Sequence, residues 1–288
     1  MMKIYLSADI EGITGTTHWN ETDAGNAEWE AARQQMTAEV AAACQGALDA
    51  GATEIWVKDS HDTARNLIAA ELPQAARLIR GWSGHPFLTL QELDNTFAAV
   101  ALIGYHSPVG SGGSPLAHSF TGKVTMLKLN GRLVSEFLMD ALTSAYVGVP
   151  LVFLSGDQGI CEAALAFNPS IQTVAVKQGV GASTINLHPA LALERIRQGM
   201  AQAVAQAAAF RQPALPDHFV LEARYRAAFN AYHDAFYPGA QQIDSATVRF
   251  ESDNLYISGI CIRESFTETT NSGICSKAVL GIQIIAEH

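Results

Sequence analysis

The sequence is poor in cysteine and in charge. It has four cysteines among 288 residues, none in a CxxC pair, and charged residues make up 16% of the chain. A chain this long does not need disulfides to hold its core together, so the pattern does not indicate a disulfide framework. We therefore expect reduced thiols in a cytoplasmic protein. The cysteines are Cys44, Cys161, Cys261 and Cys275.

Long apolar runs and basic clusters are also missing. No stretch approaches the roughly 18 apolar residues that a membrane-spanning helix needs, and the apolar run ahead of Asp9 is too short for a signal peptide. The formal net charge is −10, the sequence pI is about 5.3, and no run of Lys or Arg occurs. These features argue against nucleic-acid and membrane partners.

The chain does have enough apolar residues for a large core, at 48% hydrophobic. Its length suits one large or two medium domains, and the low charge is consistent with a surface partly buried in an oligomer. Predicted strands alternate with helices, which indicates an α/β fold with a mostly parallel sheet flanked by helices. Strands are expected over residues 3–8, 53–58, 76–80, 97–104, 124–129, 150–154, 171–176, 219–225 and 247–251, and helices over 24–50, 134–146, 158–167 and 189–210.

A segment with two prolines, RQPALPDH at residues 211–218, resembles a linker. We therefore predict an α/β metal-binding catalytic domain over residues 1–212 and a smaller C-terminal region, of α+β type, over 213–288. From residue 253 onward the tail shows no clear period, and its packing is left unassigned.

Three predicted strands each run into side chains that bind metals. The first ends at Asp9 and Glu11, the second at Asp59 and His61, and the third at His106. In an open α/β sheet, ligands bind in the crevice beyond the carboxyl ends of the strands. Three segments therefore deliver carboxylate and imidazole groups to one edge of the sheet, which predicts a metal-dependent site for hydrolysis.

Each of these residues also has an ordinary structural interpretation. Asp9 and Glu11 would fit a solvated turn, and the DSHD run at His61 would fit a turn or a helix cap. In the functional interpretation His61 binds a metal, and Asp59 or Asp62 orients its ring. A lone His106 after an apolar strand is more often a core residue than a ligand, so it is the coincidence of three strand ends that favours a metal site.

Two further residues are candidates beside this edge. Glu136 lies in the first turn of a predicted helix, where the helix dipole alone would favour an acid. His118 follows a loop rich in Gly and Ser, and it is either a surface histidine or a general acid/base. Weaker candidates are the segment 178–183 (QGVGAS), which only loosely matches a phosphate loop, and the triplet 155–157, which fits a turn or the same cleft.

Short blocks of the sequence resemble a known family, the D-aminopeptidases of the DppA type (peptidase family M55). The blocks are SADIEG at 7–12, DSH at 59–61, GYH at 104–106, AHS at 117–119, and NGR at 130–132 followed by Glu136. The likeness covers roughly residues 3–250, and blocks that occur in this order are far more specific than any one of them.

The resemblance implies a zinc-dependent aminopeptidase that removes N-terminal D-amino acids from short peptides or aminoacyl amides by means of water activated by two metals. Asp9 would bridge two zinc ions, Glu11, His61, His106 and Glu136 would be the other ligands, and His118 would be catalytic. It also implies a second, smaller domain and a ring-shaped homo-oligomer, a decamer made of two pentameric rings. The tail departs from the family pattern, because a terminal helix would be expected there.

Two other functions use the same residue types. The first is another two-metal hydrolase, such as a phosphoesterase, although no cluster of Arg or Lys suited to a phosphoryl group accompanies the blocks. The second is a metal-stabilised peptide-binding protein without catalysis. The handedness of the substrate is not evident from any residue and rests on the resemblance alone.

Overall fold

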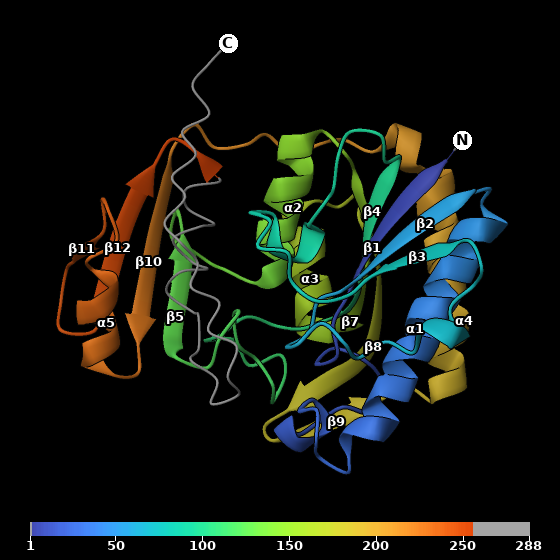
Figure 1. Ribbon diagram of the computed structural model, residues 1–288, viewed down its shortest axis with the longest axis horizontal. Helices are drawn as coiled ribbons and strands as arrows, with labels where there is room; N and C mark the ends of the chain where they lie inside the picture. Colours follow the sequence, from blue (N-terminus) through green and yellow to red (C-terminus); the bar gives the residue numbers. More distant parts are fainter. Residues whose placement is uncertain (1, 256–288) are drawn as a thin grey trace.

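The computed structural model describes residues 2–255 of the chain (Figure 1). Its strands are β1 (Lys3–Ala8), β2 (Glu54–Asp59), β3 (Ala76–Ile79), β4 (Ala99–Tyr105), β5 (Val124–Leu129), β6 (Arg132–Leu133), β7 (Leu151–Asp157), β8 (Gln172–Val180), β9 (Ser183–Asn186), β10 (Phe219–Tyr225), β11 (Gln241–Gln242) and β12 (Thr247–Ser252). The α-helices are α1 (Trp29–Asp49), α2 (Glu136–Val147), α3 (Gln158–Phe167), α4 (Pro189–Ala205) and α5 (Ala228–Asp234), and single 3-10 turns lie at Trp19–Glu21, Ala69–Glu71, Leu88–Leu90 and Ala207–Ala209.

The larger sheet has the strand order β3-β2-β1-β4-β7-β8-β9 among the described residues. All its pairs are parallel except the final β8–β9 hairpin. β1 lies between β2 and β4, so the chain runs to one side of β1 first and to its other side afterwards. Such a reversal of strand order is the place where open α/β sheets bind ligands, at the carboxyl ends of the strands. The fold class predicted from the sequence is confirmed.

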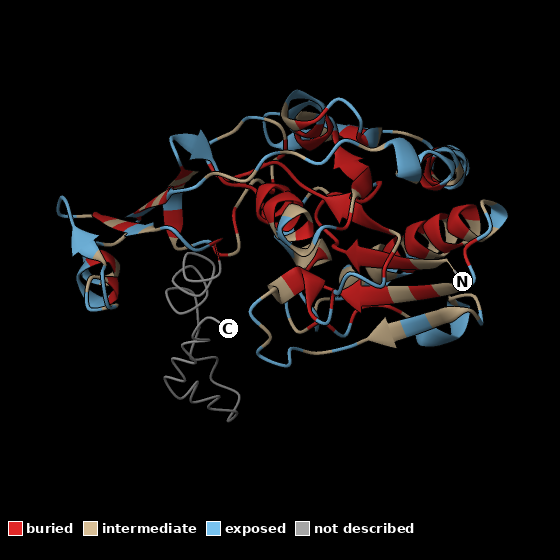
Figure 2. Ribbon diagram, turned by 90° about the horizontal axis from the view of Figure 1, so that it is seen from above, coloured by how far each residue is buried: buried red, intermediate tan, exposed pale blue. Residues whose placement is uncertain are grey.

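Helices cover both faces of this sheet, as expected for strands that are apolar on both sides. One apolar core includes residues of α1 and α4, and the other includes residues of α2 and α3. Every residue of β4 and of β7 is buried, and Figure 2 shows the buried residues concentrated in the central strands of the larger sheet. The strand ends are therefore held in a rigid scaffold.

The smaller sheet is antiparallel, with the order β11-β12-β10-β5-β6 in the described part of the chain. Its inner face shares an apolar core with α2 and α3, through residues such as Leu127, Leu221 and Phe250. β5 and β6 precede residue 212 and β10 follows it, so this sheet takes strands from both sides of the boundary expected there. That boundary stays a prediction.

Several elements differ from the sequence-based expectation for local reasons. α1 begins at Trp29 rather than near residue 24, because Gly25 has a φ of 110°, which an α-helix cannot contain. Segment 178–183 forms the β8–β9 hairpin and is not a phosphate loop. Residues 155–157 are the last of strand β7 rather than a turn. The unassigned tail beyond residue 255, with Cys261 and Cys275, lies outside the described residues, and among residues 2–255 no helix is long and apolar enough to span a membrane.

Candidate metal centre

The three strand ends singled out in the sequence meet at one place. Asp9 and Glu11 follow β1, His61 follows β2 and His106 follows β4. The loop after β1 lies directly against the end of β4: the Gly12 amide donates to the Gly104 carbonyl, and a Cβ on Gly104 would lie 2.2 Å from the Asp9 carbonyl oxygen. Only glycine permits this approach, and Gly104 also has a φ of 73°.

Asp9 lies between two histidines. Its Oδ1 is 3.3 Å from Nδ1 of His61, and its Oδ2 is 3.4 Å from Nε2 of His106. Glu11 approaches the same His61 nitrogen, with Oε2 at 3.0 Å. The Asp9 carboxylate therefore presents one oxygen to each side of the cluster, which is the arrangement a bridging ligand requires.

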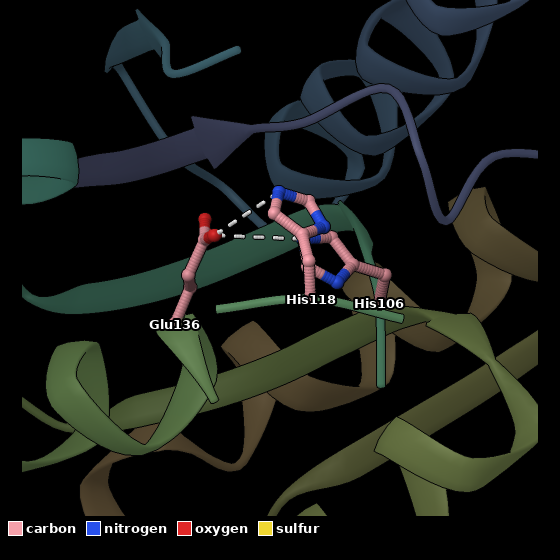
Figure 3. A group of neighbouring side chains, drawn as sticks. All are labelled: His106, His118 and Glu136. Atoms are coloured by element: carbon pink, nitrogen blue, oxygen red, sulfur yellow. Dashed lines mark ion pairs between the residues drawn. The ribbon is translucent and has the colours of Figure 1, made fainter. Parts of the chain in front are cut away.

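A second group lies on the His106 side and consists of His106, His118 and Glu136 (Figure 3). Glu136 is the first residue of α2, and its Oε1 is 3.5 Å from Nε2 of His106 and 3.9 Å from Nε2 of His118. The two imidazoles stack, with ring centroids 4.2 Å apart and planes 8° apart. In the described chain, candidate ligand atoms lie within 4.8 Å of one another in this group, and likewise in the group of Asp9, Glu11 and His61.

Each of the three histidines is oriented by a backbone carbonyl on its far side. His61 Nε2 lies 2.8 Å from the Thr22 oxygen, and Nδ1 of His106 and of His118 each lie 3.0 Å from the Ser107 and Leu116 oxygens, respectively. A carbonyl only accepts, so these ring nitrogens carry the hydrogen. The nitrogen facing the carboxylates is then free to bind a metal, as in most protein metal sites.

Carboxylates behind the site hold the loops that carry these histidines. Asp59 accepts from the amides of Asn66 and Leu67, at 2.5 and 2.8 Å, and the Asn66 side chain donates to the His61 carbonyl. Asp59 therefore supports the loop, whereas the expected contact of Asp59 or Asp62 with the His61 ring is not formed.

Asp157 plays the corresponding part for the loop after β4. It accepts from the amide and the hydroxyl of Ser107, at 2.7 and 2.5 Å, and from the Ile160 amide as the N-cap of α3. Ser107 in turn supplies the carbonyl that orients His106. One buried carboxylate thus connects the start of a helix to the position of a candidate ligand.

The buried carboxylates and histidines of the cluster shift one another's pKa values. Burial, together with the charge of Glu11, raises the pKa of Asp9 to about 8. Burial also acts against the charged forms of His61 and His106, but the neighbouring carboxylates prevail. They raise the His61 pKa well above its usual value and the His106 pKa to about 10.

The other members shift in the complementary direction. Burial opposes the charged forms of Glu11 and Glu136, yet the nearby histidines outweigh it and lower both pKa values. The pKa of His118 is lowered by burial and then by the charge of His106. Protonated histidines thus balance the carboxylates, and a bound cation would displace those protons and take over their charge.

Three buried atoms at the centre lack a hydrogen bond among the described residues: Asp9 Oδ2, Glu11 Oε2 and His106 Nε2. They lie 3.0 to 3.4 Å from groups of the same cluster, so charge attracts them, but no hydrogen bond satisfies them. Buried polar atoms without partners are rare and call for an explanation such as an ion. Carboxylates and imidazoles are ligands that zinc accepts, so the residues fit a metal site.

The structure brings together all six residues singled out in the sequence, namely Asp9, Glu11, His61, His106, His118 and Glu136. Sequence reasoning missed two residues behind them. Asp157 holds the loop after β4, and Lys177 of β8 donates to the Glu11 carbonyl. The available signals were an acid directly before a helix and a lysine inside an apolar strand, and neither signal indicates a particular partner.

Comparison with known proteins agrees with this geometry. The family model for peptidase M55, described as D-aminopeptidase, matches residues 2–258 of the chain. The chain belongs to the D-aminopeptidase family M55. It is therefore a peptidase hydrolase, as the sequence blocks had indicated.

Members of this family provide close relatives in sequence and in structure. A D-aminopeptidase of Bacillus subtilis is 30% identical over 256 residues, which is 88% of this chain and 93% of that protein. A solved structure of the Zn-dependent D-aminopeptidase DppA from Bacillus subtilis, described as a self-compartmentalizing protease, matches with a TM-score of 0.87 and 28% identity. That match covers 95% of this chain and 100% of the other.

Proposed function

We propose that this M55 peptidase is a zinc-dependent aminopeptidase that releases N-terminal D-amino acids from short peptides or aminoacyl amides. The observation that carries the proposal is the position of Asp9 between His61 and His106, with one oxygen toward each. A single carboxylate in this position connects the two candidate ligand groups and supports a centre for two metals.

In this proposal Asp9 would help to hold both zinc ions, and the other ligands would divide between them. Glu11 and His61 lie on one side, and His106 and Glu136 lie on the other. Zinc supplies Lewis-acid chemistry when bound, since it lowers the pKa of a water molecule and polarises a carbonyl group. The protein's part is to hold the ligands and to keep bulk water away from the buried carboxylates.

His118 is proposed as the catalytic residue. Its Nε2 lies 3.9 Å from Glu136 and 4.0 Å from Glu11, farther than the corresponding distances for His61 and His106. Its pKa is lowered by burial and by His106, so the ring is neutral at pH 7 and can accept a proton at Nε2. A neutral histidine beside the reacting centre can take a proton from the nucleophile and return it to the leaving amine.

The substrate and the assembly follow from the same resemblance. The free amine of an N-terminal residue would bind a zinc ion or a carboxylate of the centre, and the D-configuration is proposed because the Bacillus relatives are D-aminopeptidases. Because the DppA relative is self-compartmentalizing, we propose a ring-shaped homo-oligomer, a homodecamer. A cytoplasmic location stays a prediction from the composition.

The decisive experiment combines metal analysis with a substrate panel. Purified protein should contain two zinc ions per chain, lose activity on chelation, and regain it with Zn²⁺. It should hydrolyse D-aminoacyl p-nitroanilides faster than their L-counterparts and leave p-nitrophenyl phosphate intact. Hydrolysis of the phosphate ester alone would support the phosphoesterase alternative, and bound zinc without hydrolysis of any substrate would support a binding protein.

A further inference from the structure

Lys177 is a buried lysine close to the candidate ligands. It lies in β8 with 3% of its surface exposed. Its ammonium group donates to the carbonyl oxygen of Glu11 and to that of Thr16, the latter at 2.5 Å. Burying an ammonium group is unfavourable unless several acceptors compensate. An apolar side chain would fill the same strand position without that penalty, so the contacts of Lys177 call for an explanation.

A buried carboxylate holds the same loop from another element. Glu39 of α1 is fully buried. Its Oε1 accepts from the Thr14 amide at 2.9 Å and from the Gln35 side chain at 3.0 Å. Lys177 therefore binds carbonyl groups of the loop and Glu39 binds an amide between them. Two buried polar side chains, Lys177 of β8 and Glu39 of α1, therefore hold the loop that begins at Asp9.

This loop, residues 9–22, contacts both candidate ligand groups. It contains Asp9 and Glu11, and its last residue, Thr22, supplies the carbonyl that orients His61. Between them, the Trp19 ring lies edge-on to His118, with centroids 5.2 Å apart. A displacement of this single loop would move two ligands and would release the orientation of two histidines.

We propose that Lys177 and Glu39 are positioning residues that keep the 9–22 loop in the conformation the zinc ions require. The inference rests on the proposed zinc function and adds to it the residues that set the spacing of Asp9 and Glu11. The Lys177 bonds to Glu11 and Thr16 join two points of the loop to β8, one directly at a ligand. Without them, both carbonyls would be buried and unpaired, and the loop would rearrange to reach water or another donor.

The test replaces Lys177 with methionine, which has a similar length and no donor. Zinc alone is the probe: the holoenzyme is titrated with a chromophoric chelator to obtain the zinc dissociation constant. We expect Lys177→Met to weaken zinc binding by about 10- to 100-fold, as is typical when support of metal ligands is lost. Lys177→Arg keeps the donors and should recover a large part of that loss. Glu39→Gln keeps the acceptor and should have the smaller effect.

Val176→Ala is the matched control. Val176 neighbours Lys177 in β8, is fully buried in the α1–α4 core, and has an apolar side chain that makes no hydrogen bond to the 9–22 loop. This variant loses core packing but leaves the loop contacts in place, so its zinc affinity should stay within about threefold of wild type. Equal losses of zinc affinity in Val176→Ala and Lys177→Met would overturn the proposal, because a general loss of stability would then explain both.

Hydrogen exchange gives a readout that does not depend on zinc. The amides of Gly12 and Thr14 are bonded to the Gly104 carbonyl and to Glu39, and in Lys177→Met they should exchange at least about tenfold faster than in wild type and in Val176→Ala. Unchanged exchange together with unchanged zinc affinity in Lys177→Met would refute the role of Lys177. Wild-type protein that binds no zinc would instead refute the proposed function, while the exchange rates would still decide whether Lys177 holds the loop.

Discussion

At the scale of single residues, His118 differs from the other two histidines of the centre. His61 and His106 each lie within 3.5 Å of two carboxylates, whereas His118 is 3.9 Å or more from its nearest ones. We expect His118→Ala to keep zinc at the wild-type level and to lose about 10²- to 10⁴-fold in kcat, the usual contribution of a general acid/base. Metal analysis beside steady-state kinetics checks this. Loss of zinc would make His118 a ligand instead, and retained turnover would remove its catalytic role.

Asp140 is another buried acid of α2, one helical turn beyond Glu136. The Thr89 hydroxyl donates to its carboxylate, and the Tyr105 hydroxyl lies 2.5 Å from Asp140 Oδ2 and 2.8 Å from the Ser7 hydroxyl oxygen. Tyr105 has a single hydroxyl hydrogen and two acceptors, so a protonated Asp140 that donates to Tyr105 would satisfy all of them. Burial raises the pKa of Asp140 to about 7, which agrees with a proton held there.

This pKa predicts how stability depends on pH. Because the folded-state pKa of Asp140 lies above its unfolded value of about 3.9, its contribution is fully present below pH 4 and is lost as the pH rises through 7. Asp140→Asn should remove this loss, so the variant should gain stability relative to wild type between pH 4 and 8, by about 2–4 kcal/mol. Urea unfolding at several pH values measures the gain. Parallel curves for the two proteins would contradict the prediction.

At the scale of elements, the site depends on how closely the loop after β1 approaches the end of β4. Gly104 has a φ of 73°, and a Cβ there would lie 2.2 Å from the Asp9 carbonyl oxygen and 2.8 Å from Ile13. With any other residue at this position, the loop after β1 and the end of β4 would have to move apart. That movement would shift Asp9 away from His106. Asp9 lies on the first of these segments and His106 on the second, so stability and metal binding both depend on the contact between Gly104 and Asp9.

Gly104→Ala should therefore lose about 1–3 kcal/mol of unfolding free energy and bind zinc more weakly. Gly122→Ala is the matched control, since Gly122 has open space where a Cβ would be and no positive φ. It should stay within about 0.5 kcal/mol of wild type. Denaturant unfolding and zinc titration of both variants test this, and equal stability of the two variants would show that the contact relaxes easily.

The helices and strands also differ in how well the sequence predicted them. The apolar runs of β1 and β4 and the residues just after them were found from the sequence, because strand patterns and polar ends are local features. The start of α1 was predicted too early, since the effect of Gly25 depends on its φ of 110°. The β8–β9 hairpin was missed because its glycines also fit a phosphate loop, and only pairing between strands distinguishes the two.

At the scale of the whole molecule, the proposed ligands come from four separate segments: the ends of β1, β2 and β4 and the start of α2. Bound zinc would connect these segments in the folded state and has no equivalent site in the unfolded chain. Zinc should therefore stabilise the entire fold, by about 4 kcal/mol at a concentration a thousand times its dissociation constant.

A thermal unfolding series tests this linkage. Wild-type protein should show a higher Tm with zinc than with a chelator, and His61→Ala should show little difference between the two conditions. The exposed His233, far from the centre in sequence and on α5, provides the control variant His233→Ala, which should keep the full zinc-dependent shift. An identical Tm for wild type with zinc and with chelator would contradict a metal centre that joins these segments.

The sequence by itself determined the α/β class, the strand ends that carry acids and histidines, and the motif blocks of the family, because alternation of apolar runs and short motifs is written locally along the chain. Only the tertiary structure decided that Asp9 stands between His61 and His106, that Lys177 reaches the Glu11 carbonyl, and that the smaller sheet combines β5 with β10. These facts depend on strand order and on packing between segments as much as 166 residues apart. Such long-range contacts follow from the burial of whole faces against each other, which no local pattern specifies.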